Sequence, residues 1–192
     1  FLNLLFGNTS LPDDVVLVDA EIPPAILAAH PGPNFGLAGL RARVGAGRRA
    51  LACSAIKPQG LPPAQLASLV ERFARGGLDY VKDDHGLADQ AYSPFAARVA
   101  ACAAGMRAAA AITGHPTRYV PSVTGTQDAM RRQIRTARDE GIDTVMLAPM
   151  IAGVANMAAL VAEFPDIAFF AHPSLAGAAR PRHVFFAQGL AS

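Results

Sequence analysis

Short apolar runs alternate with amphipathic stretches from residue 49 onward. The segment "ALACSAI" (50–56) has the continuous apolar character of a buried strand. The segment "PAQLASLVERFARGG" (63–77) follows with apolar residues at helical i, i+3, i+4 and i+7 positions, and two glycines stop it. The same order recurs along the chain. The pattern predicts strands at 50–56, 78–81, 118–123, 143–149 and 166–172, and helices at 63–77, 93–112, 126–141 and 154–164.

Apolar strands without polar alternation, separated by amphipathic helices, indicate a parallel sheet that is covered on both faces. The predicted fold class is therefore α/β. The pattern of elements alone leaves two architectures open, a (β/α) barrel and a doubly wound sheet. The glycines of "GLRARVGAG" (39–47) fall short of a dinucleotide-binding fingerprint and are interpreted as a turn.

The two ends of the chain do not follow this alternation. The segment "VVLVDAEI" (15–22) is a further strand candidate, and "HPGPNFG" (30–36) has the Pro and Gly content of a linker. We expect residues 1–36 to be the end of another domain, and 37–179 to hold the five strand units. Residues 180–192 are expected to form a divergent tail. The sequence starts with Phe1 inside an apolar run, as if partway through a domain.

Composition narrows the functional classes. The 192 residues are 52% apolar and 17% charged with a formal net charge of +2, which is typical of a globular domain and argues against nucleic-acid binding. The apolar stretch 96–113 is interrupted by Arg98 and Arg107, so a membrane span is not expected. Two cysteines, Cys53 and Cys102, suit reduced thiols and a cytoplasmic location.

Charged residues follow three of the predicted strands. Lys57 ends the first strand, Lys82 and Asp84 end the second, and His172 ends the fifth. If the strands are parallel, these ends converge at one rim of the sheet, where barrel enzymes place their reacting groups. Strand geometry puts Lys82 and Asp84 on one face, while His85 depends on the turn that follows.

A plain structural interpretation competes with this one. The stretch "KDDHG" (82–86) also suits a polar loop between strand and helix, with an aspartate as helix cap. A single cluster of charged residues after one strand would favour this interpretation as a polar loop. Three separate strand ends with Lys, Lys-Asp-Asp-His and His favour a functional site.

Several motifs in register resemble the large subunit of RuBisCO. They are "GPNFGL" (32–37), "IKPQGL" (56–61) and "GGLDYVKDDHG" (76–86), while "LFGN" (5–8) and "EIPPAIL" (21–27) look like the end of that family's N-terminal domain. The resemblance implies a partial TIM (β/α)8 barrel with about five of eight strands. An α/β N-terminal domain would precede it.

The resemblance also implies roles for individual residues. Lys57 would shuttle protons, and Lys82 would add carbon dioxide to become a carbamate that binds Mg²⁺. Asp84 would be a second metal ligand, His172 would match the active-site histidine after the fifth strand, and Asn8 would reach a neighbouring subunit's site. A carbamate explains the lysine, because Mg²⁺ prefers oxygen ligands and an ammonium group offers none.

The chain departs from the family pattern at several positions. His85 takes the place of a glutamate, which makes it the third candidate metal ligand, and Gln59 takes the place of a second lysine. Pro173 and Ala176 stand where the family has an Arg and a His that contact phosphate. These changes argue against a bisphosphate substrate, and thus against true carboxylation. They favour the RuBisCO-like (type IV) proteins.

Within that branch, "KPQGLPP" (57–63) and "KDDHGLADQAYSP" (82–94) look closest to 3-oxo-isoapionate-4-phosphate decarboxylases. The resemblance thus implies a magnesium-dependent carboxy-lyase that acts on a phosphorylated sugar or 3-oxo sugar acid through an enolate. An enolase or isomerase of methionine salvage is the first alternative. A truncated, catalytically silent relative is the second. The full-length protein is expected to be a homodimer.

Overall fold

The structure is a computed structural model that describes residues 2–30 and 32–179. It divides into two compact units, one formed by residues 1–31 with 173–192 and the other by residues 32–172. Each unit is described by itself. The divergent tail expected at 180–192 lies outside the described residues.

The unit of residues 32–172 holds five short parallel strands. β1 pairs with β2, β2 with β3, and β4 with β5, all in parallel register. A parallel bridge between Ser122 and Met146 links the two groups, and Val123 N–H donates to the Met146 carbonyl over 2.8 Å. The strands are β1 (Cys53–Ala55), β2 (Tyr80–Lys82), β3 (Arg118–Val120), β4 (Thr144–Leu147) and β5 (Ala168–Ala171).

The strands thus follow one another in chain order, which distinguishes the two architectures that the sequence left open. A doubly wound sheet reverses its strand order at a switch point, whereas a barrel adds each strand beside the last one. The observed order is that of a partial barrel, so the predicted fold class is confirmed. Four of the five predicted strands contain an observed one, and β2 overlaps the strand predicted at 78–81 but ends one residue later, at Lys82.

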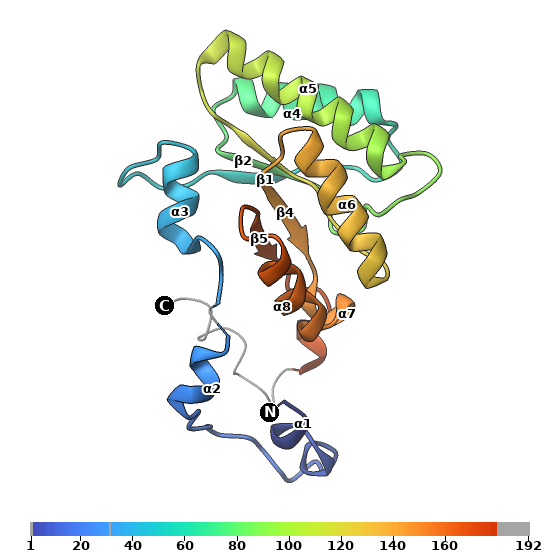
Figure 1. The fold of residues 1–192 in the computed structure, drawn as a ribbon. Coiled ribbons are helices and arrows are strands. Elements are labelled where there is room, and N and C mark those ends of the chain that lie inside the picture. Colours follow the sequence, from blue (N-terminus) through green and yellow to red (C-terminus); the bar gives the residue numbers. More distant parts are fainter. Residues whose placement is uncertain (1, 31, 180–192) are drawn as a thin grey trace. The chain divides into compact units, whose positions relative to one another are not determined.

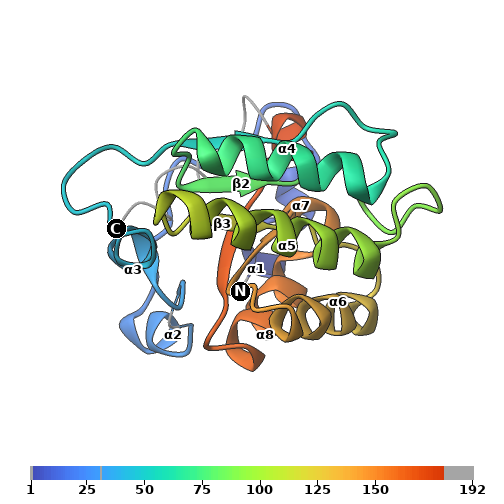
Figure 2. The ribbon, with the colours of Figure 1, turned by 90° about the horizontal axis from the view of Figure 1, so that it is seen from above.

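Helices cover one face of this curved sheet (Figures 1 and 2). The predicted helices are confirmed with small shifts of their ends. α4 and α5 pack closely, because Gly105 has no Cβ; an added Cβ would lie 2.7 Å from the Ala67 carbonyl oxygen. The outer helices are α4 (Pro63–Arg75), α5 (Phe95–Thr113), α6 (Gln127–Asp139) and α8 (Val154–Glu163), with a short α7 (Pro149–Ala152) before α8.

Successive strand residues contribute to two different apolar clusters, as the two-residue period of a strand requires. Val81, Tyr119 and Val145 belong to the larger cluster, which also contains the buried faces of the helices. Tyr80 and Val120 belong to a smaller cluster on the opposite, inner face. Lys82 has the parity of Tyr80 and therefore belongs to the inner face.

The inner cluster is completed by a helix that the sequence did not reveal. Residues 39–47 were interpreted as a turn, and this is wrong for their first half, because α3 (Gly36–Arg43) runs through them. α3 lacks a clear apolar stripe, so its sequence gives little helical signal. Leu40 and Val44 nevertheless pack against the inner cluster, and Tyr80 Oη donates to the Leu40 carbonyl over 2.8 Å.

An ion pair between a buried aspartate and a partly exposed arginine lies at the end of the sheet where the strands begin. Asp79 comes just before β2 and its side chain is fully buried. Both of its oxygens accept from the Arg49 guanidinium, one also accepts from Ala52 N–H at 2.8 Å, and His115 Nε2 lies 3.3 Å away. The hydrogen bonds from Arg49 lower the pKa of Asp79 to about 2, against the opposing effect of burial.

The described residues of the other unit, 2–30 and 173–179, have little regular structure. They contain α1 (Leu2–Leu5), α2 (Pro24–Ala28) and two 3₁₀ turns, η1 (Asn8–Ser10) and η2 (Ala176–Ala179). The strand predicted at 15–22 is wrong, because none is observed there. Its Val15, Val16 and Val18 are exposed. No described segment forms a ladder with it, and a strand needs such a partner to satisfy its backbone.

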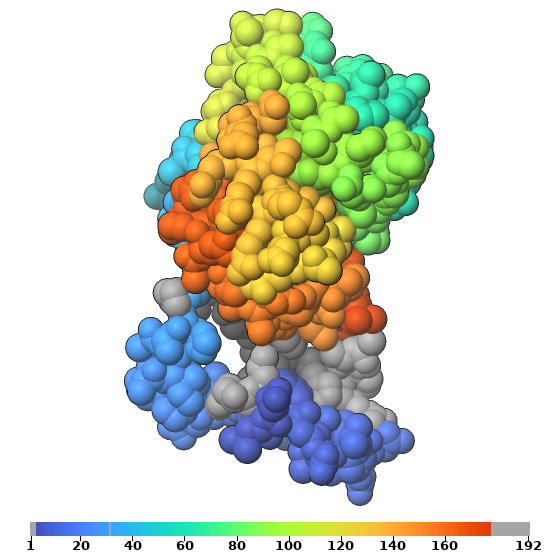
Figure 3. All heavy atoms as spheres, turned by 45° about the vertical axis from the view of Figure 1, so that its right-hand side comes forward, coloured from blue at the N-terminus to red at the C-terminus, as the bar shows by residue number. Residues whose placement is uncertain are grey.

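The surface formed by α5 and α6 is visible in Figure 3. On α6, Arg131, Arg135 and Arg138 form ion pairs with carboxylates at the end of α8 and beyond it. In the described part of the chain, α5 alone has the length and composition of a membrane-spanning helix, with a mean hydropathy of 1.4. Its buried face contributes Val99 and Cys102 to the larger apolar cluster.

Candidate active site at the strand ends

The carboxyl ends of β1 and β2 meet at the Asp84 carboxylate. Lys57 Nζ, just after β1, lies 3.1 Å from Asp84 Oδ2. Gln59 Nε2 and Gly86 N–H each donate to Asp84 Oδ1 over 2.9 Å, and His85 Nδ1 lies 3.4 Å from the same oxygen. The ends of the first and second strands therefore meet, as the sequence predicts for parallel strands.

Asp84 is held as an anion by these neighbours. Its side chain is 5% exposed, whereas that of Lys57 is 66% exposed. Burial raises the pKa of Asp84, but hydrogen bonds from Gly86 and Gln59, followed by Lys57, outweigh it and hold the pKa well below its usual range. The result is an ionised carboxylate, held by several hydrogen bonds at the rim of the sheet, beside an exposed cation.

Two histidines stack at the same rim. The rings of His85 and His172 lie 4.7 Å apart at an angle of 13°. His172 directly follows β5, so the stack joins the ends of the second and fifth strands. Burial, together with the neighbouring Lys82 and His85, lowers the pKa of His172, which favours a neutral imidazole that can accept a proton.

Lys82 also lies at the end of β2, but its side chain contacts the backbone and not a carboxylate. Its Nζ donates to the backbone carbonyl of Asp83 over 3.1 Å. The ion pairs found among residues 2–30 and 32–179 do not include it, and Asp84 is paired with Lys57 instead. In this arrangement Lys82 forms no ion pair with either of the neighbouring aspartates, Asp83 and Asp84.

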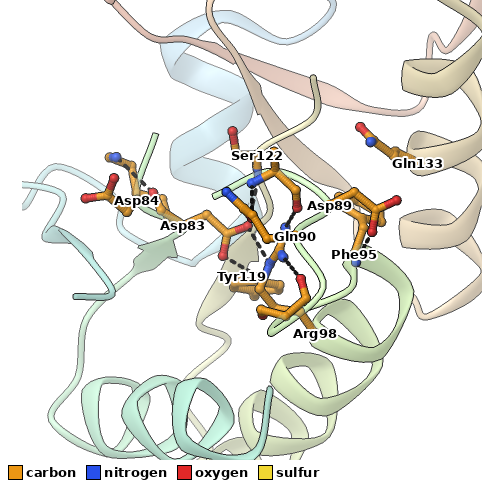
Figure 4. Close-up of polar contacts among 12 residues, drawn as sticks. Asp83, Asp84, Asp89, Gln90, Phe95, Arg98, Tyr119, Ser122 and Gln133 are labelled. Carbon is orange, nitrogen blue, oxygen red and sulfur yellow. Dashed lines mark hydrogen bonds and ion pairs between the residues drawn. The ribbon is translucent and has the colours of Figure 1, made fainter. Parts of the chain in front are cut away.

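Asp83 points away from the site, as Figure 4 shows. It is fully buried on the helix side of the sheet, where its carboxylate accepts from Tyr119 Oη at 2.5 Å, Arg98 Nε at 3.1 Å and Ser122 N–H at 3.0 Å. Sequence reasoning missed Arg98, which it treated as an interruption of an apolar helix. The sequence did contain a signal for its role: Arg98 is a single charged residue on the face of α5 that packs against the sheet.

Asn8 lies in the other unit, where it is exposed in η1. Its expected role at a neighbouring subunit's site stays a prediction.

The side chains of Asp84, His85 and Lys82 suit Mg²⁺ only if Lys82 carries a carbamate. Among the described residues, no group of three or more His, Cys, Asp or Glu side chains is arranged to hold a metal ion. Asp84 offers oxygens and His85 a nitrogen, while an unmodified Lys82 offers no lone pair. A carbamate on Lys82 would add the oxygens that Mg²⁺ prefers. The imidazole of His85 is better suited to manganese or zinc.

The distribution of lysine is a further signal. The chain has 17 basic Lys and Arg residues, but Lys57 and Lys82 are its only lysines. Both follow or end neighbouring strands at the same rim. Lysine can lose its proton when its surroundings change and can react with carbon dioxide, which arginine does not do in proteins. A chemical role for these two lysines stays a prediction.

Replacing Gly86 with alanine is expected to disconnect Gln59 from Asp84. The added Cβ would lie 1.9 Å from Gln59 Nε2, the flexible end of that side chain, so Gln59 must turn away while the backbone stays in place. Loss of one hydrogen bond to a charged group costs about 1.5–3 kcal/mol. We expect kcat/KM of the complete gene product to fall about tenfold or more, as measured by steady-state kinetics.

A double-mutant cycle with Gln59→Ala is the control. If the clash with Gln59 is the cause, adding Gly86→Ala to Gln59→Ala changes the rate little. Fully additive losses would contradict this explanation.

The family model for the catalytic domain of the ribulose bisphosphate carboxylase large chain matches residues 36–183. The chain is 60% identical, over 93% of its length, to 5-methylthioribulose-1-phosphate isomerase of Rhodospirillum rubrum. It is 34% identical, over 94% of its length, to 2,3-diketo-5-methylthiopentyl-1-phosphate enolase of Geobacillus kaustophilus. The chain spans about half the length of the curated relatives it matches, 48% and 44% in these two cases.

The structure agrees with these sequence matches. The crystal structure of a Rubisco-like protein from Rhodopseudomonas palustris superposes with a TM-score of 0.88 at 53% identity, covering 91% of this chain and 50% of that one. The motifs, the strand order and the match over residues 36–183 all lead to one assignment. The chain belongs to the RuBisCO large-chain family and, within it, is a relative of the RuBisCO-like (type IV) proteins.

Proposed function

We propose that the complete gene product is an isomerase or enolase that moves a proton next to the carbonyl group of a phosphorylated sugar such as 5-methylthioribulose 1-phosphate. The single observation that carries this proposal is the 60% identity to the isomerase named above, over a region that includes the whole strand-end cluster. The second relative named above is an enolase. Decarboxylation, the first expectation from the sequence, has less support than this alternative.

Isomerisation needs groups that accept and return a proton. His172, with its lowered pKa, is suited to take a proton from the carbon beside the carbonyl. The C–H electron pair then forms a C=C bond while the carbonyl pair moves to oxygen. Lys57 is exposed and lies 3.1 Å from Asp84; in this proposal it would donate a hydrogen bond to that oxygen or a proton to the neighbouring carbon. Substrate and product have the same composition, so no carbon dioxide is released.

The family's metal ion fits this chemistry. Asp84, a carbamylated Lys82 and His85 are the residues that would hold it. When bound, Mg²⁺ supplies positive charge that favours an enolate oxygen.

Proton exchange with solvent separates the two reactions. The complete gene product, incubated with 5-methylthioribulose 1-phosphate in D₂O, is expected to form an isomer that carries deuterium at the reacting carbon, as seen by NMR. A 3-oxo sugar acid phosphate should release no carbon dioxide. Rapid carbon dioxide release from that acid, without turnover of the ketose phosphate, would refute the proposal.

Lys82 gives a separate prediction. If it becomes a carbamate, prior incubation with bicarbonate and Mg²⁺ should increase activity, and ¹³C-labelled bicarbonate should give a carbamate signal in NMR. Lys82→Arg should lose both, because a guanidinium cannot form this carbamate oxygen donor. Lys57→Arg is the matched control, since it removes the chain's other lysine and should keep the ¹³C signal. A signal that persists in Lys82→Arg would exclude Lys82 as its source.

The remaining expectations are proposals for the complete gene product. They are a homodimer in which Asn8 contributes to the partner's site, a phosphorylated sugar or sugar acid as substrate, and a cytoplasmic location. The 192 residues alone are expected to be catalytically silent, because the later loops of a barrel commonly bind the phosphate group. Turnover by residues 1–192 alone would contradict this.

A further inference from the structure

A fully buried arginine lies directly behind the candidate active site. Arg98 is the fourth residue of α5 and faces the end of β2, with 0% of its side chain exposed. Its Nε donates to Asp83 Oδ2 over 3.1 Å. The Asp83 carboxylate also accepts hydrogen bonds from Tyr119 Oη and Ser122 N–H. Its three donors therefore come from α5, from β3 and from the loop after β3.

The other two nitrogens of Arg98 bind a different part of the chain. Nη1 donates to the Ser93 carbonyl and Nη2 to the Ala88 carbonyl, each over 2.8 Å. Both carbonyls belong to residues 84–93, the segment that connects β2 with α5 and begins with Asp84. We call this segment the β2–α5 loop. One guanidinium therefore joins the end of β2 to the middle and the last residue of the β2–α5 loop (Figure 4).

The loop is also ordered from within. Gln90 Nε2 donates to the Gly86 carbonyl and its Oε1 accepts from Ala88 N–H, each over 2.8 Å. Asp89 accepts from Phe95 N–H at 2.7 Å, at the start of α5. These contacts make the loop one connected piece, so an anchor on Ala88 and Ser93 is transmitted to Gly86, whose N–H contacts Asp84.

Asp83 transmits the position of Arg98 to the site in a second way. Its backbone carbonyl accepts from Lys82 Nζ at 3.1 Å, and its N–H donates to the Val120 carbonyl at 2.9 Å. Lys82 and Asp84 are its two neighbours along the chain. A rotation of Asp83 about the strand axis would therefore turn both functional side chains away from the inner face.

We propose that Arg98 is a positioning residue for Lys82 and Asp84, acting through Asp83 and the β2–α5 loop without touching the substrate. This inference rests on the proposed function for its kinetic consequence. A planar guanidinium suits the task, because it presents its donors in a fixed fork, whereas an ammonium is a single point of charge. Each of the three side-chain nitrogens of Arg98 donates to a different acceptor. Lysine has a single side-chain nitrogen and cannot reach all three.

Arg98→Lys is the principal variant, because it keeps a cation beside the buried Asp83 while giving up the fork. In the complete gene product, we expect a cooperative melt and faster amide hydrogen exchange within residues 84–93, with exchange in β1–β5 unchanged. The kcat value should fall about tenfold to 100-fold, since small misplacements of reacting groups have effects of this size. KM should stay within about twofold, because Arg98 is not a substrate contact.

Two controls separate positioning from stability. Arg107→Lys changes the same residue type on the same helix, at a side chain that is 56% exposed, and should alter neither exchange nor kcat. Tyr119→Phe removes one donor from Asp83 but leaves the loop anchored, so it should lower the melting temperature without speeding exchange in residues 84–93. Arg98→Met, which leaves Asp83 without its cation, should melt at a lower temperature than Arg98→Lys.

Unchanged kcat and exchange in Arg98→Lys would overturn the inference. Exchange that rises equally in the loop and in all strands would also overturn it, because that is the result of a merely structural role. If the wild-type protein does not turn over 5-methylthioribulose 1-phosphate, the proposed function fails by itself. The exchange measurement then still decides whether Arg98 positions the loop.

Discussion

Replacing Asp84 with alanine is expected to lower kcat/KM of the complete gene product by about 1,000-fold, equivalent to about 4 kcal/mol of transition-state stabilisation. Asp84 is the one carboxylate of the strand-end cluster, and its ionised form pairs with Lys57 at 3.1 Å. Without it, Lys57 loses its partner, and the proposed Mg²⁺ site would lose a hard oxygen ligand. Steady-state kinetics at several Mg²⁺ concentrations would measure the loss.

Asp128→Ala is the control for this prediction. Asp128 is an exposed carboxylate on α6 whose side chain is 77% exposed, so its removal should leave the kinetics unchanged. Thermal melts should show that Asp84→Ala is folded. Wild-type activity in folded Asp84→Ala would exclude Asp84 from the site.

Replacing Asp79 with alanine is expected to lower the free energy of unfolding by about 2–4 kcal/mol, between the effect of a surface ion pair and that of a fully buried pair. The intermediate value follows from the pair itself, because Asp79 is fully buried while 45% of the Arg49 side chain is exposed. Its loss leaves Ala52 N–H without its acceptor. Urea unfolding would measure the change, and Asp19→Ala, at an exposed position, is the control.

This pair also predicts a pH dependence. The pKa of Asp79 is lowered to about 2 in the folded chain from an ordinary value of 3.8. Its contribution to stability is therefore complete above about pH 5 and is lost as pH falls toward the folded pKa. The difference between wild type and Asp79→Ala should shrink across this window. A constant difference down to about pH 2 would contradict the assignment.

Most of the fold could be predicted because its signals are local. The run "VML" (145–147) is apolar on both faces because every residue of β4 is buried, and the apolar stripe of α4 is visible at helical spacing. The strand predicted at 15–22 failed because β structure depends on a pairing partner, which sequence pattern does not report. α3 was missed because its burial is against the inner face of the sheet, through Leu40 and Val44.

The candidate site divides in the same way. The sequence by itself determined the α/β order and placed Lys57, Lys82, Asp84 and His172 at strand ends, since element boundaries and strand parity are local properties. Only the tertiary structure decided which partner each of the two neighbouring aspartates, Asp83 and Asp84, binds. Asp83 and Asp84 are identical neighbours in the sequence, but the two-residue period turns one toward Arg98 on the helix side and the other toward Lys57 at the rim. The parity is local, but the partners are not: Arg98 and Lys57 come from elements on either side of β2 in the chain, and only their packing brings them to the two carboxylates.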